Sequence, residues 1–150
     1  MPYHIHEGRF DADCLEDRSV NILTLAVPDG EPLNLVVSRD TLRPGEDLKS
    51  CLNRQIKELS RSVQAFEELG REGGWLGPGD DASYPAIVLY TRFKQGGKLF
   101  FQAQCLAQLP QDKLLVLTLT SPSAFDDALR ARWKKIILQF VPALNRPVAD

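Results

Sequence analysis

The chain has 150 residues, of which 43% are hydrophobic and 25% charged, a composition typical of ordinary globular domains. A chain of this length fits one domain, so we expect a single domain over residues 1–150. The net charge of −2 argues against nucleic-acid binding, because proteins that grip phosphate backbones usually carry a basic excess.

The N-terminal residues contain no basic stretch followed by an apolar run, so no signal peptide is expected. The longest apolar runs, such as Leu114–Leu117, are far shorter than a membrane-crossing helix, and we expect no insertion into a membrane. Three widely spaced cysteines fit a reducing compartment better than a disulfide framework. Cys51 and Cys105 are expected to be small buried side chains. Together these features predict a cytoplasmic protein.

The first third of the chain predicts three strands. Tyr3–Glu7 is a short one. Ser19–Val27 is rich in β-branched and apolar residues and has no glycine or proline. Leu33–Arg39 follows the turn-forming residues Pro28–Pro32, so we expect it to pair with Ser19–Val27 as a hairpin.

A long amphipathic helix is predicted next, in the segment that ends at Gly70. Its apolar residues recur at spacings of three and four: Leu48, Leu52, Ile56, Leu59, Val63, Phe66 and Leu69. Glu46 and Asp47 suit the positive N-terminal end of a helix, and Gly70 is a natural stop. The glycine-rich stretch Gly70–Pro85 is predicted to hold at most a short strand around Trp75.

Three more strands and a closing helix complete the pattern. Ala86–Lys94 and Lys98–Leu109 flank a hairpin signal of two glycines, and Lys113–Ser121 is a further strand. Ser121–Ser123 is expected to cap a helix that Pro142 ends. The apolar face of this helix contains Phe125, Leu129, Trp133, Ile136 and Phe140. Short links favour antiparallel pairing, so the predicted fold class is α+β, with two amphipathic helices on one face of a mainly antiparallel sheet.

The histidines and the first cysteine do not indicate a chemical site. His4 and His6 share one side of a strand, but they are the only two histidines, and zinc would need further ligands. Cys14 is flanked by Asp13 and Glu16, whose carboxylates raise rather than lower the pKa of a thiol. We therefore expect no metal site and no nucleophilic cysteine.

Two patterns in the later hairpin could be mistaken for nucleotide or nucleic-acid sites. Gly96–Lys98 lacks the earlier glycine and the following Ser or Thr of a phosphate loop. The segment Tyr90–Phe101 interleaves aromatic and basic residues, as stacking platforms do, but strand alternation sends Tyr90 and Arg92 to one side and Phe93 to the other. A hairpin with a charged tip explains both patterns. With no catalytic triad or carboxylate pair, we expect no catalytic residue, no enzyme activity and no cofactor.

Strand alternation also predicts a second, unusual face of the sheet. If Leu23 and Leu35 face the helices, the residues that face away include Val20, Ile22, Thr24, Val36 and Ser38, with Gln102, Gln104, Val116, Thr118 and Thr120 on the later strands. Such a surface is apolar but carries hydroxyl and amide groups, and a large apolar patch usually marks a partner site. Alternatively, this face is buried by a second copy of the chain, or by the N-terminal segment and glycine loop of the same chain.

The order and spacing of several stretches resemble a known family: "HEGRF", "DRSVNIL", "LVVSRD", the glutamine-bearing "QAQCL" and "LLVLTLTSP". Over roughly residues 3–141 the chain resembles the DcrB-like family, and within it the Eag chaperones of type VI secretion. The resemblance implies a curved antiparallel sheet of the PsbP/Mog1 kind, backed by helices. It also implies a cytoplasmic homodimer that is not an enzyme.

The same resemblance implies a function. Eag chaperones bind and shield the hydrophobic N-terminal transmembrane segments of PAAR-containing effectors, including Rhs toxins, before export. Matched by motif, the effector-binding positions are Val20, Ile22, Val36, Ser38, Gln55, Leu59 and one or both of Gln102 and Gln104, with Thr24 on the same predicted face. The alternative function is a DcrB-like domain that binds another protein or only itself, with no role in secretion.

Overall fold

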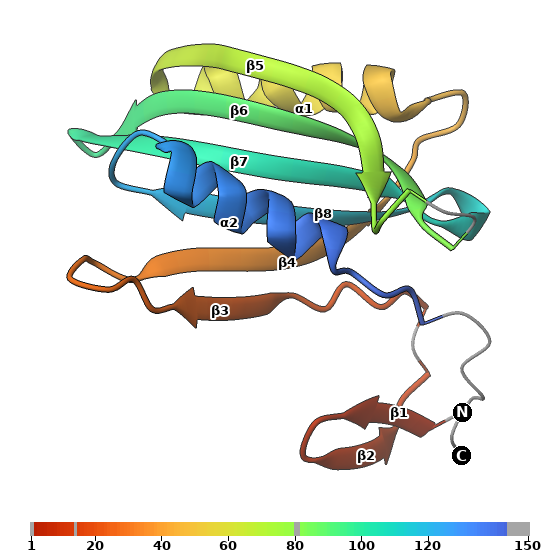
Figure 1. The fold of residues 1–150 in the computed structure, drawn as a ribbon. Helices are drawn as coiled ribbons and strands as arrows, with labels where there is room; N and C mark the ends of the chain where they lie inside the picture. Colours follow the sequence, from red (N-terminus) through yellow and green to blue (C-terminus); the bar gives the residue numbers. More distant parts are fainter. Residues whose placement is uncertain (1, 14, 80–81, 144–150) are drawn as a thin grey trace.

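The computed structural model describes residues 2–13, 15–79 and 82–143 of the chain. The elements in chain order are β1 (Pro2–Ile5), β2 (Gly8–Asp11), β3 (Asn21–Leu25), β4 (Leu33–Thr41), α1 (Leu48–Ser62), β5 (Gln64–Leu76), β6 (Tyr84–Gln95), β7 (Lys98–Gln108), a short 3₁₀ turn (Pro110–Asp112), β8 (Lys113–Ser121) and α2 (Asp127–Leu138). Six strands form one antiparallel sheet in the order β3-β4-β8-β7-β6-β5. β1 and β2 form a separate two-stranded hairpin (Figure 1).

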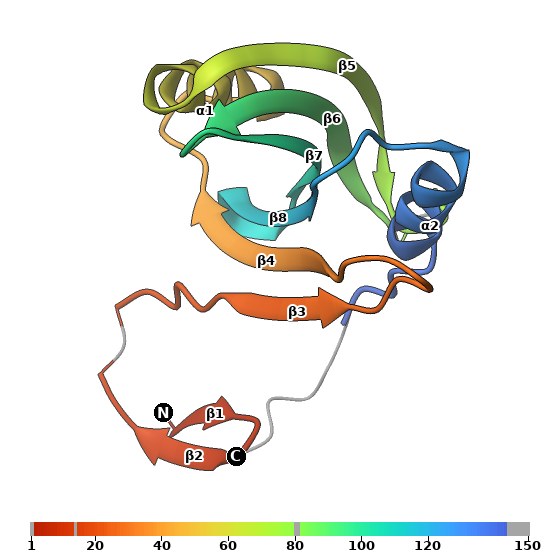
Figure 2. The same ribbon diagram turned by 90° about the vertical axis from the view of Figure 1, so that its left-hand side faces the viewer.

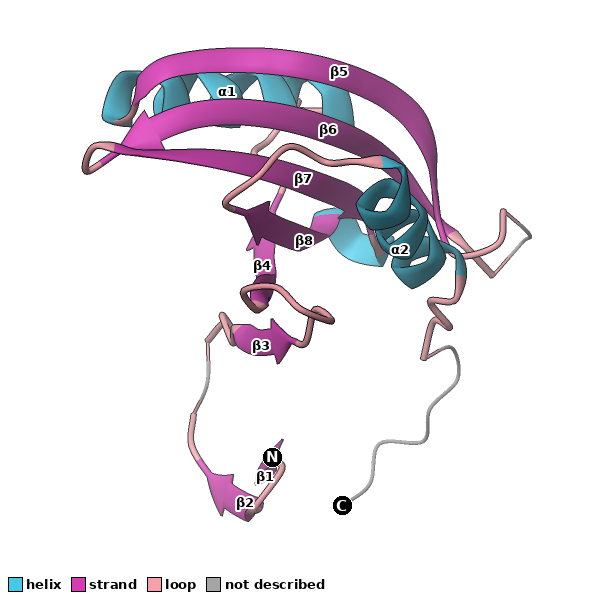
Figure 3. Ribbon diagram, turned by 60° about the vertical axis from the view of Figure 1, so that its left-hand side comes forward, coloured by secondary structure: helices cyan, strands magenta, loops and turns pink. Residues whose placement is uncertain are grey.

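The predicted α+β class is confirmed, with two helices and a curved antiparallel sheet. Figure 3 shows β5, β6 and β7 arching together over their length. The predicted hairpins also form: β3 pairs with β4, and β6 pairs with β7 around the two glycines. These pairings are local in sequence, which is why turn residues and alternation were enough to predict them.

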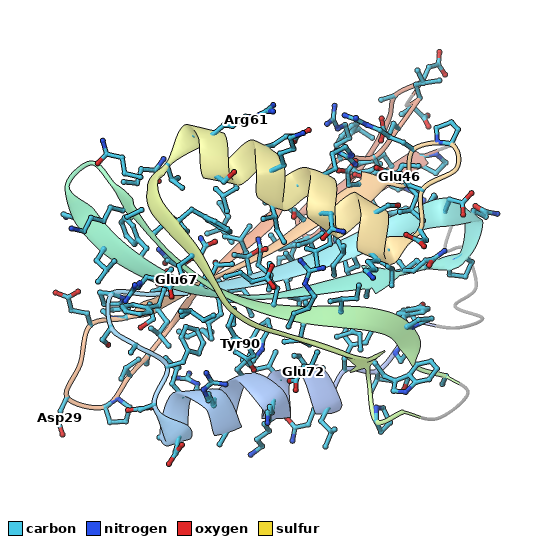
Figure 4. All side chains as sticks on the ribbon, turned by 90° about the horizontal axis from the view of Figure 1, so that it is seen from above. Asp29, Glu46, Arg61, Glu67, Glu72 and Tyr90 are labelled. Atoms are coloured by element: carbon cyan, nitrogen blue, oxygen red, sulfur yellow. The ribbon has the colours of Figure 1, made fainter. Side chains whose placement is uncertain are left out.

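The two helices cover opposite faces of the sheet, so the prediction that both lie on one face is wrong (Figure 4). One apolar cluster joins α2 to one face through Trp133, Ile137, Leu35, Cys105 and Leu117. A second cluster joins α1 to the other face through Cys51, Leu52, Leu89, Leu106 and Leu114. Successive strand residues point to opposite faces, and Val88 and Leu89 of β6 are both buried. The central strands are therefore apolar on both sides, and each side needs its own helix.

The predicted long helix is also wrong in its second half, because α1 ends at Ser62 and β5 begins at Gln64. The hydroxyl groups of Ser60 and Ser62 donate to backbone carbonyls of α1, which weakens a helix at these positions. The free edge of β6 then offers β5 a full ladder of backbone hydrogen bonds, although with register shifts near its start. Glycines that were expected in a loop therefore lie in a strand of 13 residues.

Both helices begin at an aspartate. Asp47 caps α1, accepting from the backbone N–H of Ser50, while the Ser50 hydroxyl accepts from the backbone N–H of Asp47. Asp126 caps α2 by accepting from the backbone N–H of Leu129 at 2.8 Å. The predicted cap at Ser121–Ser123 is wrong, because the Ser121 hydroxyl donates instead to the carbonyl of Ser123.

Glu46 links the loop before α1 to the helix through hydrogen bonds (Figure 4). Its carboxylate accepts from the side chain of Arg54 at 2.7 Å and from the backbone N–H of Arg43 at 2.9 Å. The hydrogen bond from Arg54, followed by that from Arg43, lowers the pKa of Glu46 from 4.5 to about 2. The ionised carboxylate therefore stabilises the folded protein.

The pH dependence of folding tests this interaction. The contribution of Glu46 is complete above pH 4.5, where the carboxyl is ionised in the unfolded chain too, and is lost as the pH falls towards 2. Urea unfolding of Glu46→Gln between pH 2 and pH 6 is expected to show a weaker loss of stability on acidification than the wild type. Arg54→Met removes the partner and is expected to flatten the profile in the same way. A wild-type acid profile in both variants would contradict this role.

Candidate functional site

Four neighbouring strands bring most of the predicted site residues into one patch. On the α1 side of the sheet, Ile22 of β3 pairs with Val36 of β4, which pairs with Thr118 of β8, which pairs with Gln104 of β7. Residues in register on adjacent strands have side chains on the same face. Ile22 is 71% exposed, while the other three are half-buried. The four therefore form one continuous row across the sheet.

A second row lies beside the first. It runs from Thr24 of β3 through Asn34 and Thr120 to Gln102 of β7. We call the residues of these rows and the adjacent Ser38 the Gln–Thr face: Ile22, Thr24, Asn34, Val36, Ser38, Gln102, Gln104, Thr118 and Thr120. None of these side chains is ionisable. Val20 lies just before β3 and is 53% exposed.

The two glutamines are held by threonines on the neighbouring strand. The side-chain amide of Gln102 donates to the Thr120 hydroxyl at 3.1 Å, and that of Gln104 donates to the Thr118 hydroxyl at 3.4 Å. Each pair still has an amide oxygen that can accept and a hydroxyl hydrogen that can donate. The Gln–Thr face can therefore bind apolar surface and also satisfy isolated polar groups that emerge from it.

Helix α1 lies on the same side of the sheet as the Gln–Thr face. Its buried residues Cys51 and Leu52 cover Leu89 and Leu106. Further along the helix, Gln55 and Leu59 are half-buried, and the amide of Gln55 donates to the Cys51 sulfur at 3.6 Å. A helix on the same face as Leu23 and Leu35, as predicted, would have kept Gln55 and Leu59 away from the other candidates. In the structure α1 lies on the side of the sheet that carries the Gln–Thr face.

The opposite face of these strands is closed by α2. Tyr90 of β6 points towards this helix (Figure 4), and the guanidinium of Arg130 lies 4.5 Å from the centre of its ring. Burial, reinforced by the nearby charge of Glu72, raises the pKa of the Tyr90 hydroxyl. The aromatic ring is therefore part of the packing beneath α2, and its hydroxyl stays protonated.

The histidines and cysteines that were considered as metal ligands or nucleophiles do not form a site among the described residues. His4 and His6 are exposed on the separate N-terminal hairpin, and the described residues contain no group of three potential metal ligands. Cys51 and Cys105 are buried, as predicted, and burial raises the pKa of both thiols, that of Cys105 to about 12. Cys14 lies outside the described residues. The buried thiols therefore stay protonated at neutral pH and pack as apolar side chains.

Two cavities lie away from the Gln–Thr face. The first, of about 460 Å³, lies between the β3–β4 turn and the start of α2. The second, of about 450 Å³, lies beside the end of β4. Two ionisable residues that line the first cavity already bond to the protein: Asp126 caps α2, and Arg132 donates to the carbonyl of Ala26 at 2.7 Å. These contacts suit a structural role for the two residues.

Sequence reasoning predicted the Gln–Thr face only in part. Alternation in β8 already separated Thr118 and Thr120 from the leucines between them, but the pairing of each threonine with one glutamine depends on the register of β7 against β8. Asn34 was missed as well, because its place in the second row follows from its pairing with Thr24 and Thr120. Register between strands that are distant in sequence has no local signal.

Among the described residues, no helix combines the length and the apolar character needed to cross a membrane. Among solved structures, the fold is similar to that of PA94 from Pseudomonas aeruginosa, described as a protein of unknown function and putative regulator. The TM-score is 0.75 at 22% identity, over 95% of this chain and 96% of that one. LpqN of Mycobacterium tuberculosis, involved in cell envelope biogenesis, gives a TM-score of 0.48 at 18% identity, over 95% and 90%.

Curated proteins give no match to this sequence. The model of the DcrB family matches residues 7–139, a span that includes every strand of the six-stranded sheet and both helices. The family match therefore covers the Gln–Thr face and the helix beside it. This chain belongs to the DcrB family.

Proposed function

We propose that this protein is a cytoplasmic chaperone of the Eag type. It binds the hydrophobic N-terminal transmembrane helices of a PAAR/Rhs-type effector of type VI secretion and shields them from water before export. The observation that carries the proposal is the Gln–Thr face, a surface on the α1 side of the sheet whose nine residues are apolar or neutral polar. No cofactor and no catalytic residue are needed for this role.

The dimensions of the Gln–Thr face suit one helix. Strands lie about 4.8 Å apart, so the four strands β3, β4, β8 and β7 span roughly 14 Å, slightly more than the diameter of a helix with its side chains. Along β4 the face extends from Asn34 to Ser38, five residues or roughly 16 Å, which is the length of about eleven residues of helix. The face therefore covers about half the length of one membrane-spanning helix that lies along the strands.

The chemistry of the face suits a membrane segment as well. Burying apolar surface is worth about 25 cal/mol per Å², which favours covering an apolar helix that would otherwise aggregate in water. Transmembrane helices often carry small or hydroxyl-bearing residues that approach other helices closely. The Gln102–Thr120 and Gln104–Thr118 pairs offer acceptors and donors to such groups. A charge at this position would cost binding energy, because the client would bury it without a partner.

The alternative is a DcrB-family domain that binds a different protein, or itself, and has no role in secretion. The exposure of Ile22 and Leu23 favours this alternative. The two side chains lie on opposite faces of the edge strand β3, and a protein partner at that edge would cover both. The gene neighbourhood separates the two proposals. An Eag-type chaperone should be encoded beside a PAAR or Rhs effector with apolar N-terminal stretches.

Co-expression with the N-terminal segment of that effector tests the proposal directly. The variant Ile22→Asp plus Gln104→Ala is expected to reduce the co-purified effector at least about tenfold, because an unpaired carboxylate would be buried against the client. Its own stability should fall only modestly, since Ile22 is 71% exposed and Gln104→Ala removes one half-buried hydrogen bond, a loss of about 1 kcal/mol. Leu138→Asp plus Gln139→Ala, at the end of α2, is the matched control and should keep wild-type capture. Undiminished capture by the first variant would contradict the site assignment, and a wild type that never captures the segment would contradict the function.

A further inference from the structure

The N-terminal hairpin, β1 and β2, has one apolar side that is largely exposed. Tyr3 pairs with Phe10 across the hairpin, and their rings lie 5.5 Å apart. Ile5 lies on the same side as Tyr3, because side chains alternate along a strand. Ile5 is 47% and Phe10 is 50% exposed, and among the described residues neither belongs to the apolar clusters under α1 and α2. Both side chains are therefore available to a further apolar surface.

Asp17 fixes the hairpin beside the start of β3. One oxygen of its carboxylate accepts from the Tyr3 hydroxyl at 2.9 Å, and the other accepts from the backbone N–H of Ser19 at 2.9 Å. The hydrogen bond from Ser19, with a smaller contribution from Tyr3, lowers the pKa of Asp17. Arg39 of β4 in turn donates to the carbonyl of Ser19 at 3.0 Å. Figures 1 and 2 show the result: β1 and β2 lie beyond β3, near the end where that strand begins.

The Gln–Thr face is too short for a whole client helix. A membrane-spanning helix of about 20 residues is roughly 30 Å long, whereas the face extends roughly 16 Å along β4. The strands of the hairpin have four residues each and are roughly 13 Å long, close to the length of helix that the face leaves uncovered. Val20, which is largely exposed, lies between the two along the chain. A helix that extends past the start of β3 therefore reaches the end of the sheet where the hairpin is held.

We propose that the apolar side of the hairpin binds the part of the client helix that extends past the Gln–Thr face. This inference rests on the proposed chaperone function and adds a second contact surface for the same apolar helix. Tyr3 and Phe10 also line a hollow of about 270 Å³ in front of Ser19, which accepts an apolar side chain of the client. Glu16 and Arg18 line the hollow too, and they suit the charged residues that flank membrane segments.

The opposite side of the hairpin is polar and provides a matched control. His4 pairs with Arg9 there, and both side chains are exposed. A new charge on this side would not contact the client, whereas a charge at Ile5 or Phe10 would be buried against it without a partner. The two sides of one small element can therefore be compared directly.

Co-purification of the full chain with the N-terminal segment of the neighbouring effector tests the inference. The segment is used with its membrane helix intact and with that helix shortened to about 11 residues, the length that the Gln–Thr face covers. Ile5→Asp plus Phe10→Asp is expected to reduce capture of the intact segment about tenfold, because two unpaired carboxylates would be buried. Capture of the shortened segment should equal that of the wild type. His4→Asp, the control, should capture both segments as the wild type does.

Asp17→Ala provides the same test without a new charge. It removes both hydrogen bonds that fix the hairpin, so it should weaken capture of the intact segment and leave the shortened one unchanged. Circular dichroism establishes that the variants fold, which is expected because the hairpin is separate from the six-stranded sheet.

Wild-type capture of the intact segment by the hairpin variants would overturn the inference and leave the chaperone function standing. So would an equal loss of both segments, because the effect would then not depend on the length of the helix. A change in particle mass of the hairpin variants without effector, measured by light scattering, would assign the hairpin to contacts between copies of the chain instead. A wild type that captures neither segment would contradict the chaperone function, and this inference with it.

Discussion

Trp133→Ala is expected to lower the free energy of unfolding by about 3–5 kcal/mol, as is typical when a buried aromatic side chain is removed from a core. Trp133 has no exposed surface and packs at the centre of the cluster that joins α2 to the sheet. Its loss would leave a cavity between Ile137 and the strands. Urea unfolding followed by circular dichroism measures the effect.

Two further variants make this test specific. Leu138→Ala lies on the same helix, but its side chain is 61% exposed, so it should change stability by less than about 0.5 kcal/mol. Trp133→Phe keeps an aromatic ring and leaves a smaller cavity, so it should cost clearly less than Trp133→Ala. Equal losses for Trp133→Ala and Leu138→Ala would mean that α2 is not docked on the sheet as described.

Leu52→Ala is expected to cost about 2–5 kcal/mol, the usual range for a buried leucine. Leu52 is 2% exposed and packs against Leu89 and Leu106, in the smaller cluster under α1. Because this cluster has few buried members, the loss of one leucine would weaken much of the contact between α1 and the sheet. Thermal and urea unfolding measure the loss.

Lys57→Ala, on the exposed side of the same helix, is the control for Leu52→Ala and should be nearly neutral, since both residues have high helix propensity. The double variant Leu52→Ala plus Trp133→Ala asks whether the two clusters act independently. They lie on opposite faces, so their costs should add to within about 0.5 kcal/mol. A neutral Leu52→Ala would place α1 elsewhere and remove it from the border of the Gln–Thr face.

Local patterns were sufficient for strands β3, β4, β6, β7 and β8 and for most residues of the Gln–Thr face. In β3 and β4, alternation alone places Ile22, Thr24 and Val36 on one side and Leu23 and Leu35 on the other, and the structure has the same arrangement. This works because the side-chain period of a strand is two, whatever lies around it. The turn residues then identify which strands form hairpins.

Prediction from local patterns failed where the same spacing of apolar residues fits either a helix or a strand. Val63, Phe66 and Leu69 continue the helical spacing of α1, yet they lie beyond its end, and Phe66 and Leu69 belong to β5. The decision depends on the open edge of β6, which is distant in the chain and supplies hydrogen bonds that a lone helix end cannot match. The position of α1 was missed for a similar reason. Because β6 has apolar side chains on both faces, each face must pack against another element. Which helix packs on which face depends on the path of the chain.

The fold class, the β3–β4 and β6–β7 hairpins, the apolar character of β3 and the lack of charge in the Gln–Thr face can be read from the sequence, because they follow from side-chain period and turn chemistry. The hydrogen bonds of Gln102 and Gln104 to Thr120 and Thr118, the position of α1 beside this face and the edge position of β3 became known only from the folded arrangement. These features depend on strand order and register, which arise from contacts between segments far apart in the chain and leave no periodic signal within any one of them.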